Sequence, residues 1–210
     1  MKLSLNQIII LPIALGAAAA LLVFFSADLR ITQSLQQFNN PFFHWLMVAV
    51  SWPGYRINQF IIASLAAALL LLLRFRIEAV CLLLSLVAGL LLASVIKLLI
   101  ARPRPAADLA EVYRYHSTWS FPSGHVVSYV AFYGFLCYLV YMRMPPSKLR
   151  SALLVVFGAL ISLVGLSRVY LGAHWASDTL AGYCIGFLWL TLMIQIYWRL
   201  KLDRITERSY

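Results

Sequence analysis

The stretch EAVCLLLSLVAGLLLASVIKLLI, residues 78–100, is apolar over almost its whole length. A helix needs about 17 to 25 mostly apolar residues to cross a hydrocarbon core that is roughly 30 Å thick, and this stretch is long enough. Ser85, Gly89 and Ala93 recur at four-residue steps, which leaves one helix face small enough for a neighbouring helix to pack closely. The stretch therefore predicts a membrane-spanning helix inside a helix bundle.

The rest of the chain has the same character. Its 210 residues are 63% hydrophobic and 11% charged, and ordinary soluble domains carry about 25% charged residues. The mean hydropathy is +0.86. Runs long enough to span fall at 7–26, 57–73, 78–100, 123–142, 151–167 and 175–198. We expect an all-α integral membrane protein with six transmembrane helices that form a single domain over residues 1–210.

The first run and the segment after it need separate interpretation. A retained helix at 7–26 is favoured over a cleaved signal peptide, because its apolar core is longer than a usual signal core and LLVFFSADLR offers no good cleavage pair. In the following segment, residues 27–56, the run between Pro41 and Pro53 is too short to span. We expect short interfacial or re-entrant helices there.

The distribution of basic residues predicts the orientation. The formal net charge is +10, from 17 Lys and Arg against 7 Asp and Glu. With both termini in the cytosol, ten basic residues fall inside and seven outside, in agreement with the positive-inside rule. The charge is therefore attributed to topology in the plasma (inner) membrane and to contact with anionic lipids, and no nucleic acid partner is expected.

Three polar clusters fall at the predicted outer face. The first, KLLIARPRP at 97–105, holds Lys97 and Arg104 on a connector that prolines stiffen. Alone, this cluster is also compatible with a lysine that reaches the interface and a plain basic loop. The second, FPSGHVVSYV at 121–130, starts a helix whose unpaired N–H groups favour an anion, with Gly124 allowing close approach and His125 beside it.

The third cluster is SRVYLGAHWASD at 167–178. His174 and Asp178 are four residues apart, so they share one face if the last helix begins near Ala173, and the carboxylate can then accept a hydrogen bond from the imidazole. Such a bond fixes the imidazole tautomer and stabilises its positive form. The alternative is a paired polar cap at the membrane boundary.

The sum of the charges decides between a metal and an anion. Lys97, Arg104 and Arg168 bring three positive charges, and Asp178 brings one negative charge. Two histidines and a carboxylate can in other settings hold a metal. A net positive pocket repels a cation and attracts a phosphate, so the clusters predict phosphoryl transfer without a metal or another cofactor.

These residues resemble the type 2 phosphatidic acid phosphatase superfamily. Its signature is a lysine, six residues and Arg-Pro, then Pro-Ser-Gly-His, then Ser-Arg, five residues, His, three residues and Asp. The resemblance covers 97–178 without a departure. The matching positions are Lys97, Arg104, Pro105, Pro122, Ser123, Gly124, His125, Ser167, Arg168, His174 and Asp178.

The resemblance implies a six-helix membrane phosphatase with a phosphohistidine intermediate. It implies that His174 attacks phosphorus, that Asp178 orients His174, and that His125 protonates the leaving group and then activates water. It assigns phosphate binding to Lys97, Arg104, Ser123, Gly124 and Arg168. His116 has no matching family position and is left out of the expected site, and the loop at 106–121 is interpreted as a connector or as a cover over the site.

The expected substrate is a lipid phosphate. Phosphatidic acid, phosphatidylglycerophosphate, a lipid A phosphate and a polyprenyl pyrophosphate are all compatible, and family prevalence favours undecaprenyl pyrophosphate or a phosphatidyl phosphate. One alternative is a phosphotransferase that passes the group from the same histidine to a lipid acceptor. Another is a non-enzymatic transporter or channel lined by the buried charges. The six spans count against the soluble vanadate haloperoxidases that share the motifs, and the oligomeric state is not predicted.

Overall fold

The computed structural model describes residues 25–38 and 40–207. Within these residues every regular element is a helix, which confirms the all-α prediction. The elements are α2 (Phe25–Gln36), α3 (Pro41–Ser51), the short 3-10 helix η1 (Trp52–Gly54), α4 (Arg56–Leu72), α5 (Arg76–Ile100), α6 (Gly124–Arg143), α7 (Lys148–Tyr170) and α8 (Ala176–Glu207).

Among the described residues, four helices are long and apolar enough to cross a membrane: α5, α6, α7 and α8 as far as Leu202. Helix α4 has 17 residues and qualifies only together with α3 and η1, from which it is bent by 62°. The predicted span at 7–26 lies almost wholly outside the described residues, and Phe25 already begins α2. Four or five spans are therefore supported, and the predicted sixth is not tested.

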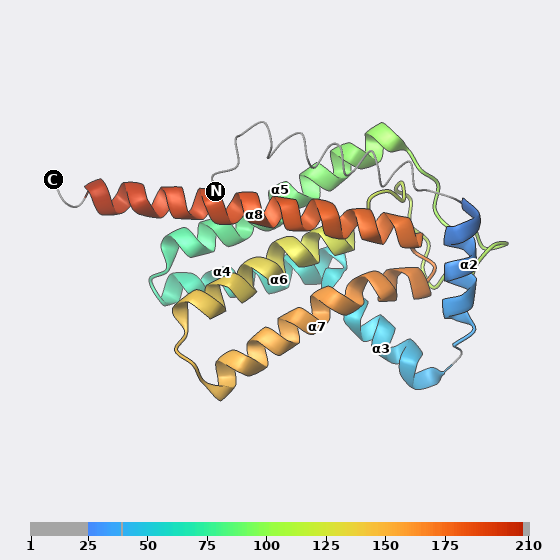
Figure 1. Cartoon of the computed structure of the whole chain (residues 1–210), viewed down its shortest axis with the longest axis horizontal. Coiled ribbons are helices and arrows are strands. Elements are labelled where there is room, and N and C mark those ends of the chain that lie inside the picture. Colours follow the sequence, from blue (N-terminus) through green and yellow to red (C-terminus); the bar gives the residue numbers. More distant parts are fainter. Residues whose placement is uncertain (1–24, 39, 208–210) are drawn as a thin grey trace.

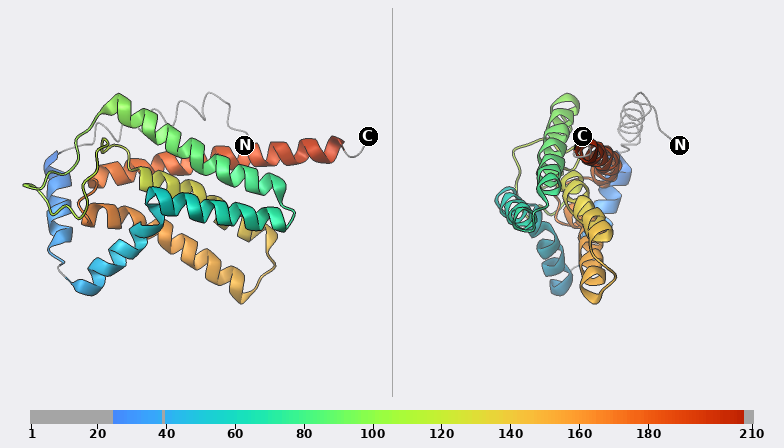
Figure 2. Two further views of the ribbon diagram at one scale, coloured as in Figure 1. Left: turned by 180° about the vertical axis from the view of Figure 1, so that it is seen from behind. Right: turned by 90° about the vertical axis from the view of Figure 1, so that its left-hand side faces the viewer.

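The helices α4 to α8 run along the long axis of the molecule, and α2 lies across one end of them (Figure 1). The end-on view in Figure 2 places α6 at the centre of the bundle. Helix α6 also has the largest buried share of the four spans, 61%. The residues at its start are therefore held on several sides by other helices.

The small-residue face of α5 packs as predicted. Ser85 donates its hydroxyl to the Ala131 carbonyl on α6 at 2.9 Å, and the indole of Trp189 on α8 donates to the Ser85 carbonyl at 2.8 Å. A Cβ at Gly89 would lie 3.2 Å from the Trp189 ring. The absence of larger side chains therefore lets α5 approach α6 and α8 closely.

Side chains hold the short crossing helices in place. Asn40 caps α3 by accepting from the backbone of Phe42 at 2.8 Å, and Pro41 occupies the first turn. The amide of Gln36 on α2 donates to the carbonyls of Glu111 and Tyr170. These bonds attach α2 to the loop at 101–123 and to the end of α7.

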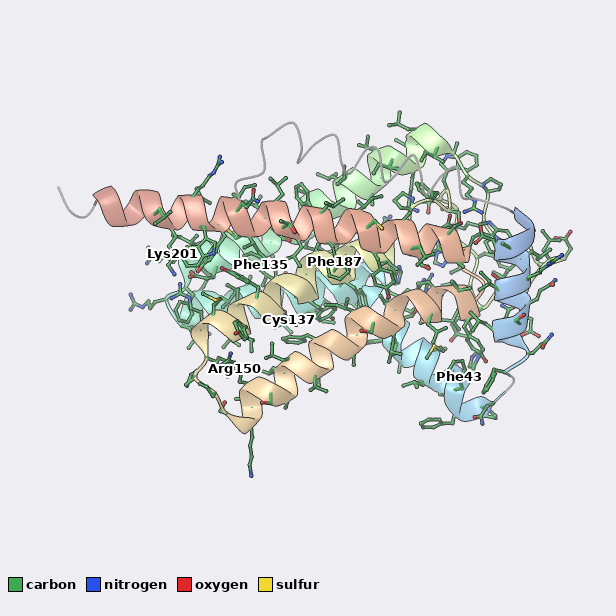
Figure 3. All side chains as sticks on the ribbon, viewed as in Figure 1. Phe43, Phe135, Cys137, Arg150, Phe187 and Lys201 are labelled. Carbon is green, nitrogen blue, oxygen red and sulfur yellow. The ribbon has the colours of Figure 1, made fainter. Side chains whose placement is uncertain are left out.

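The opposite end of the bundle carries its own polar cluster. Glu78 on α5, which is 5% exposed, pairs with Arg143 on α6 and accepts from the hydroxyl of Tyr197 on α8 at 2.9 Å. Figure 3 shows Lys201 and Arg150 at this end and Phe43 at the other. The bundle therefore has two polar ends, and the predicted site residues lie at the end that α2 crosses.

Candidate active site

One cavity of about 470 Å³ opens at the end of the bundle that α2 crosses. Six of the predicted residues line it: Lys97, Arg104, Gly124, His125, Arg168 and His174. They come from the ends of α5, α6 and α7, the loop at 101–123 and the turn before α8. The three polar clusters of the sequence therefore meet at one place.

Lys97 lies in the last turn of α5, and its ammonium points to the loop. It donates to the carbonyls of Trp119, Ser120 and Pro122 at 2.8, 3.0 and 2.7 Å. A Cβ at Gly124 would lie 3.9 Å from Cε of Lys97, so the lysine passes beside the start of α6. The alternative of a lysine that simply reaches the membrane surface is wrong.

Arg104 connects the loop to the histidine turn. It donates to the carbonyl of Thr118 at 2.7 Å and to that of Ala173 at 2.5 Å, and its Nη1 lies 3.1 Å from Nε2 of His174. Burial and the nearby charge of Arg168 lower the pKa of Arg104 to about 10. Arg104 therefore keeps its charge at neutral pH beside the histidine.

The contact with Arg104 defines the tautomer of His174. A guanidinium has only donors, so Nε2 must accept and the proton of a neutral ring is on Nδ1. His174 is 2% exposed, and burial, followed by the charges of Arg104 and Lys97, holds its pKa well below the usual value. At neutral pH the ring therefore presents an unprotonated Nε2 to the cavity.

The predicted helix start near Ala173 is wrong, because α8 begins at Ala176 and His174 lies in the turn before it. Asp178, the third residue of α8, accepts from the backbone N–H of Trp175 at 2.9 Å. This is the side-chain arm of a capping box, which stabilises a start at Ala176. His174 and Asp178 therefore face each other across a helix terminus and do not lie on one helix face.

The predicted direct hydrogen bond between these two residues is also not formed. Nδ1 of His174 lies 3.6 Å from Oδ2 of Asp178, an ion-pair distance, and 3.4 Å from Oγ of Ser120. Ser120 in turn donates to the same carboxylate oxygen at 2.5 Å. A serine that the sequence reasoning missed therefore bridges the histidine and the carboxylate.

A second missed residue, Arg102, holds the other oxygen of Asp178. Its Nη1 donates to Oδ1 of Asp178 at 2.6 Å, and its Nη2 pairs with Asp28 of α2 at 2.7 Å. Asp28 also accepts from the backbone and the hydroxyl of Ser177 at 2.9 and 2.6 Å. The chain of contacts from Asp28 to Asp178 docks α2 on the start of α8 and restrains the buried carboxylate.

The start of α6 carries buried polar atoms that no described residue satisfies. They are Oγ of Ser123 and Nε2 of His125. Ser123 precedes the helix and makes no side-chain cap bond, so N–H groups of the first turn are also left over. Ser123 is not among the cavity-lining residues. Buried polar groups are normally paired, so these atoms favour a bound anion at the helix start.

Arg168 is 1% exposed and is held by Ser51, His116 and the ring of Tyr55. It donates to Oγ of Ser51 at 3.1 Å and to Nε2 of His116 at 3.0 Å, and its Nε has no described partner. Ser167 contacts Ser51 at 2.6 Å and donates to the Met47 carbonyl, which fixes α3 against α7. Arg168 therefore reaches the cavity from a rigid helix junction.

His116 is left out of the expected site, but the structure places it in the cavity wall. His116 lines the cavity and accepts from Arg168. Burial and the charge of Arg168 lower its pKa to about 4, so the ring is neutral at pH 7. The sequence indicates this position only by placing a histidine in the loop before the second cluster.

The charge around the cavity is positive. Among the described residues that line it there are five cations and no carboxylate: Lys97, Arg104, Arg168, Arg56 and Arg114. In the same part of the chain, no group of three or more His, Cys, Asp or Glu is placed to hold a metal ion. An electropositive cavity at a helix start is suited to a phosphate.

Comparison with known proteins places the chain in a family. The profile of the PAP2 superfamily matches residues 78–202, more than half of the chain. The chain belongs to the PAP2 superfamily. Phosphatidylglycerophosphatase B of Bacillus subtilis (strain 168) is 30% identical over 164 residues, 78% of this chain and 79% of that protein. An undecaprenyl-diphosphatase of Sulfolobus acidocaldarius is 30% identical over 156 residues, 72% of this chain and 69% of that protein.

Solved structures agree with this membership. A transmembrane PAP2-type phosphatidylglycerolphosphate phosphatase from Bacillus subtilis superposes with a TM-score of 0.78 at 27% identity, covering 90% of this chain and 94% of that chain. LpxE of Aquifex aeolicus superposes with a TM-score of 0.61 at 19% identity, covering 80% of this chain and 94% of that chain, and so supports the fold alone. The resemblance inferred from the three motifs is confirmed.

Proposed function

We propose that the protein is a membrane lipid phosphatase that hydrolyses a lipid phosphate or pyrophosphate through a phosphohistidine, without a metal. The observation that carries this proposal is the contact of Nε2 of His174 with Arg104 inside the cationic cavity. An unprotonated nitrogen beside a guanidinium is a nucleophile next to a binding group for phosphoryl oxygens.

In the first step, Nε2 of His174 attacks phosphorus and the bond from phosphorus to the lipid oxygen breaks. Lys97, Arg104 and Arg168 neutralise the charge on the equatorial oxygens, which is the main requirement of phosphoryl transfer. The hydroxyl of Ser123 and the N–H of Gly124 add donors at the helix start. The imidazole becomes positive as the bond forms, and Asp178 stabilises it through space and through Ser120.

His125 exchanges protons with the oxygen that leaves in the first step and with the water that attacks in the second. Its Nε2 is buried and has no described partner, and its ring lines the same cavity as His174. It donates a proton to the leaving oxygen in the first step. In the second step it takes a proton from water, whose oxygen attacks phosphorus, and the phosphorus–nitrogen bond breaks to release phosphate and free His174.

The relatives and the cavity wall support an amphiphilic substrate. The related proteins are named for phosphatidylglycerophosphate and undecaprenyl diphosphate, and we propose one of these chemistries for this chain. Phe60 and Leu90 of α4 and α5 line one side of the cavity next to the cations. A headgroup can therefore reach the cations while the lipid tail stays among apolar side chains.

The proposal includes the arrangement in the membrane. The whole chain acts as one domain with six spans, cytosolic termini, interfacial α2 and α3, and a site at the outer face of the plasma membrane. The exposed aromatic side chains of Phe42, Trp45 and Trp52 support interfacial placement. The basic residues near the opposite end support its cytosolic location.

The deciding experiment measures phosphate release by the purified protein in detergent with EDTA, over a panel of lipid phosphates. We expect release by the wild type, and none by His174→Ala or His125→Ala proteins that keep the wild-type elution profile and melting temperature. A strict requirement for added Mg²⁺ in the chemical step would contradict the metal-free mechanism.

Two controls separate the alternatives. Adding a lipid acceptor and identifying the products by mass spectrometry detects transfer to lipid, which would support a phosphotransferase. Solute flux through liposomes that persists in a folded His174→Ala variant would support a transporter.

A further inference from the structure

The cavity carries more positive charge than one phosphoryl group requires. Lys97, Arg104 and Arg168 line the cavity together with His174, and Arg104 contacts Nε2 of His174. Two further cations, Arg56 and Arg114, line the same cavity, and no described carboxylate in its lining offsets them. Three cations already exceed the two charges of a phosphate monoester, so the outer pair is left for a second anion.

Of the outer arginines, Arg114 is next to the proposed phosphoryl site, because the Tyr55 ring contacts both Arg114 and Arg168. The guanidinium of Arg114 lies 4.7 Å from the centre of the Tyr55 ring, and that of Arg168 lies 6.0 Å from the same centre. Cation–π contacts of this kind restrain an otherwise mobile side chain. Arg114 is exposed to solvent, and this contact holds it beside the cavity.

Two polar features at the start of α4 also adjoin the cavity. Tyr55 precedes the helix, and its buried hydroxyl lies beside the guanidinium of Arg168, with which it interacts. Helix α4 has no side-chain cap, so the N–H groups of its first turn, which includes Arg56, add positive potential. A buried hydroxyl and an uncapped helix start beside the arginines of the cavity favour an anionic ligand with oxygen acceptors.

We propose that Arg56, Arg114 and the Tyr55 hydroxyl form a second anion subsite, which binds the inner phosphate of a lipid with two phosphates while the terminal phosphate reacts at His174. This inference rests on the proposed phosphatase function and specifies its substrate class. Both a diphosphate ester and a phosphatidyl headgroup with a terminal phosphate have this chemistry.

The subsite has different consequences for the two kinds of substrate. When a diphosphate reacts, the bridging oxygen leaves with the inner phosphate, which gains negative charge in the transition state. The subsite then stabilises the leaving group and raises kcat as well as lowering KM. When the inner phosphate is a diester separated by a glycerol, the leaving group is an alkoxide that His125 protonates, and the subsite lowers KM alone.

The test compares Arg56→Gln, Arg114→Gln and the double variant on lipids that share a tail. Farnesyl diphosphate is compared with farnesyl monophosphate, and phosphatidylglycerophosphate with phosphatidic acid, in the same mixed micelles. We expect kcat/KM on the two-phosphate lipid to fall about 10- to 100-fold in the double variant, as for a lost charge-assisted contact. The value for the one-phosphate lipid should fall much less. Tyr55→Phe should weaken binding of the two-phosphate lipid by a smaller factor.

The matched control is Arg30→Gln, which removes an exposed arginine of α2 that does not line the cavity. It should leave the preference for two phosphates unchanged. The subsite is overturned if kcat/KM falls equally on both kinds of lipid in the Arg56 and Arg114 variants. It is also overturned if these variants keep the wild-type kcat/KM on both.

Failure of the proposed function gives a different result. If the wild-type protein hydrolyses no lipid phosphate, the proposed phosphatase function is contradicted. The subsite is then tested by binding. In calorimetric titrations, a His174→Ala protein should bind inorganic pyrophosphate more tightly than phosphate. The added Arg56→Gln and Arg114→Gln changes should abolish that preference, and a preference that survives them overturns the subsite.

Discussion

At the scale of single residues, the site is built from groups that act through one another. His174 faces Arg104 with one nitrogen and the pair of Ser120 and Asp178 with the other. The oxygens of Asp178 are themselves held by Arg102, Ser120 and the backbone of Trp175. A carboxylate with this many partners cannot rotate away from the histidine.

Arg102 is predicted to position Asp178. Arg102→Gln removes the guanidinium that pairs with both Asp178 and Asp28. Breaking a buried ion pair in this way lowers the free energy of unfolding by about 3 to 5 kcal/mol. We expect a lower melting temperature and a kcat reduced about tenfold or more, with KM little changed because Arg102 is absent from the cavity lining. Arg102→Lys should recover part of the stability but little of kcat. A loss confined to KM would contradict a positioning role.

The pH profile of kcat/KM tests the state of His174. Because burial and two cations lower its pKa from the usual 6.5, the ring stays unprotonated as the pH falls below that value. The acid limb of the profile should therefore lie below pH 6.5. In the residual activity of Arg104→Gln the limb should move to higher pH, because a repelling charge is gone. A limb that does not move would belong to the substrate phosphate instead.

At the scale of elements, the corner between η1 and α4 shapes the site. Gly54 lies against His125, and a Cβ there would be 2.4 Å from Cδ2 of His125 and 2.7 Å from Cε2 of Tyr129. The corner thus brings α4 close enough to line the cavity without displacing the histidine. A larger residue would have to push the imidazole or the corner aside.

Gly54→Ala should therefore reduce kcat by at least tenfold while the helical circular dichroism stays unchanged. The matched control is Gly158→Ala in α7, where an added Cβ meets nothing within 4 Å. That change should leave kcat unaltered and stabilise the helix slightly, since alanine favours helix more than glycine does. Wild-type kcat in Gly54→Ala would show that the corner can adjust.

Across the molecule, the four long spans and the polar groups at their ends could be predicted from the sequence. Apolar length is a local property, and the three motifs lie at helix ends that meet in the bundle. The partners Arg102 and Ser120 of Asp178 could not be found in this way, because they lie 76 and 58 positions before it and meet it only when the loop at 101–123 folds against the start of α8. The predicted start of α8 near Ala173 is too early, because Asp178 caps the helix by accepting from the backbone of Trp175.

The orientation of the bundle gives the last prediction. The end of α6 and the start of α7, on either side of their connection, carry Arg143, Lys148 and Arg150, which favours a cytosolic location for this end. Ala107, in the loop at the opposite end, and Pro146, in the connection, are both exposed. A cysteine at Ala107 should react with a membrane-impermeant maleimide in intact cells, and one at Pro146 only after lysis. The reverse pattern would place the site at the cytosolic face, where it would meet lipids of the inner leaflet.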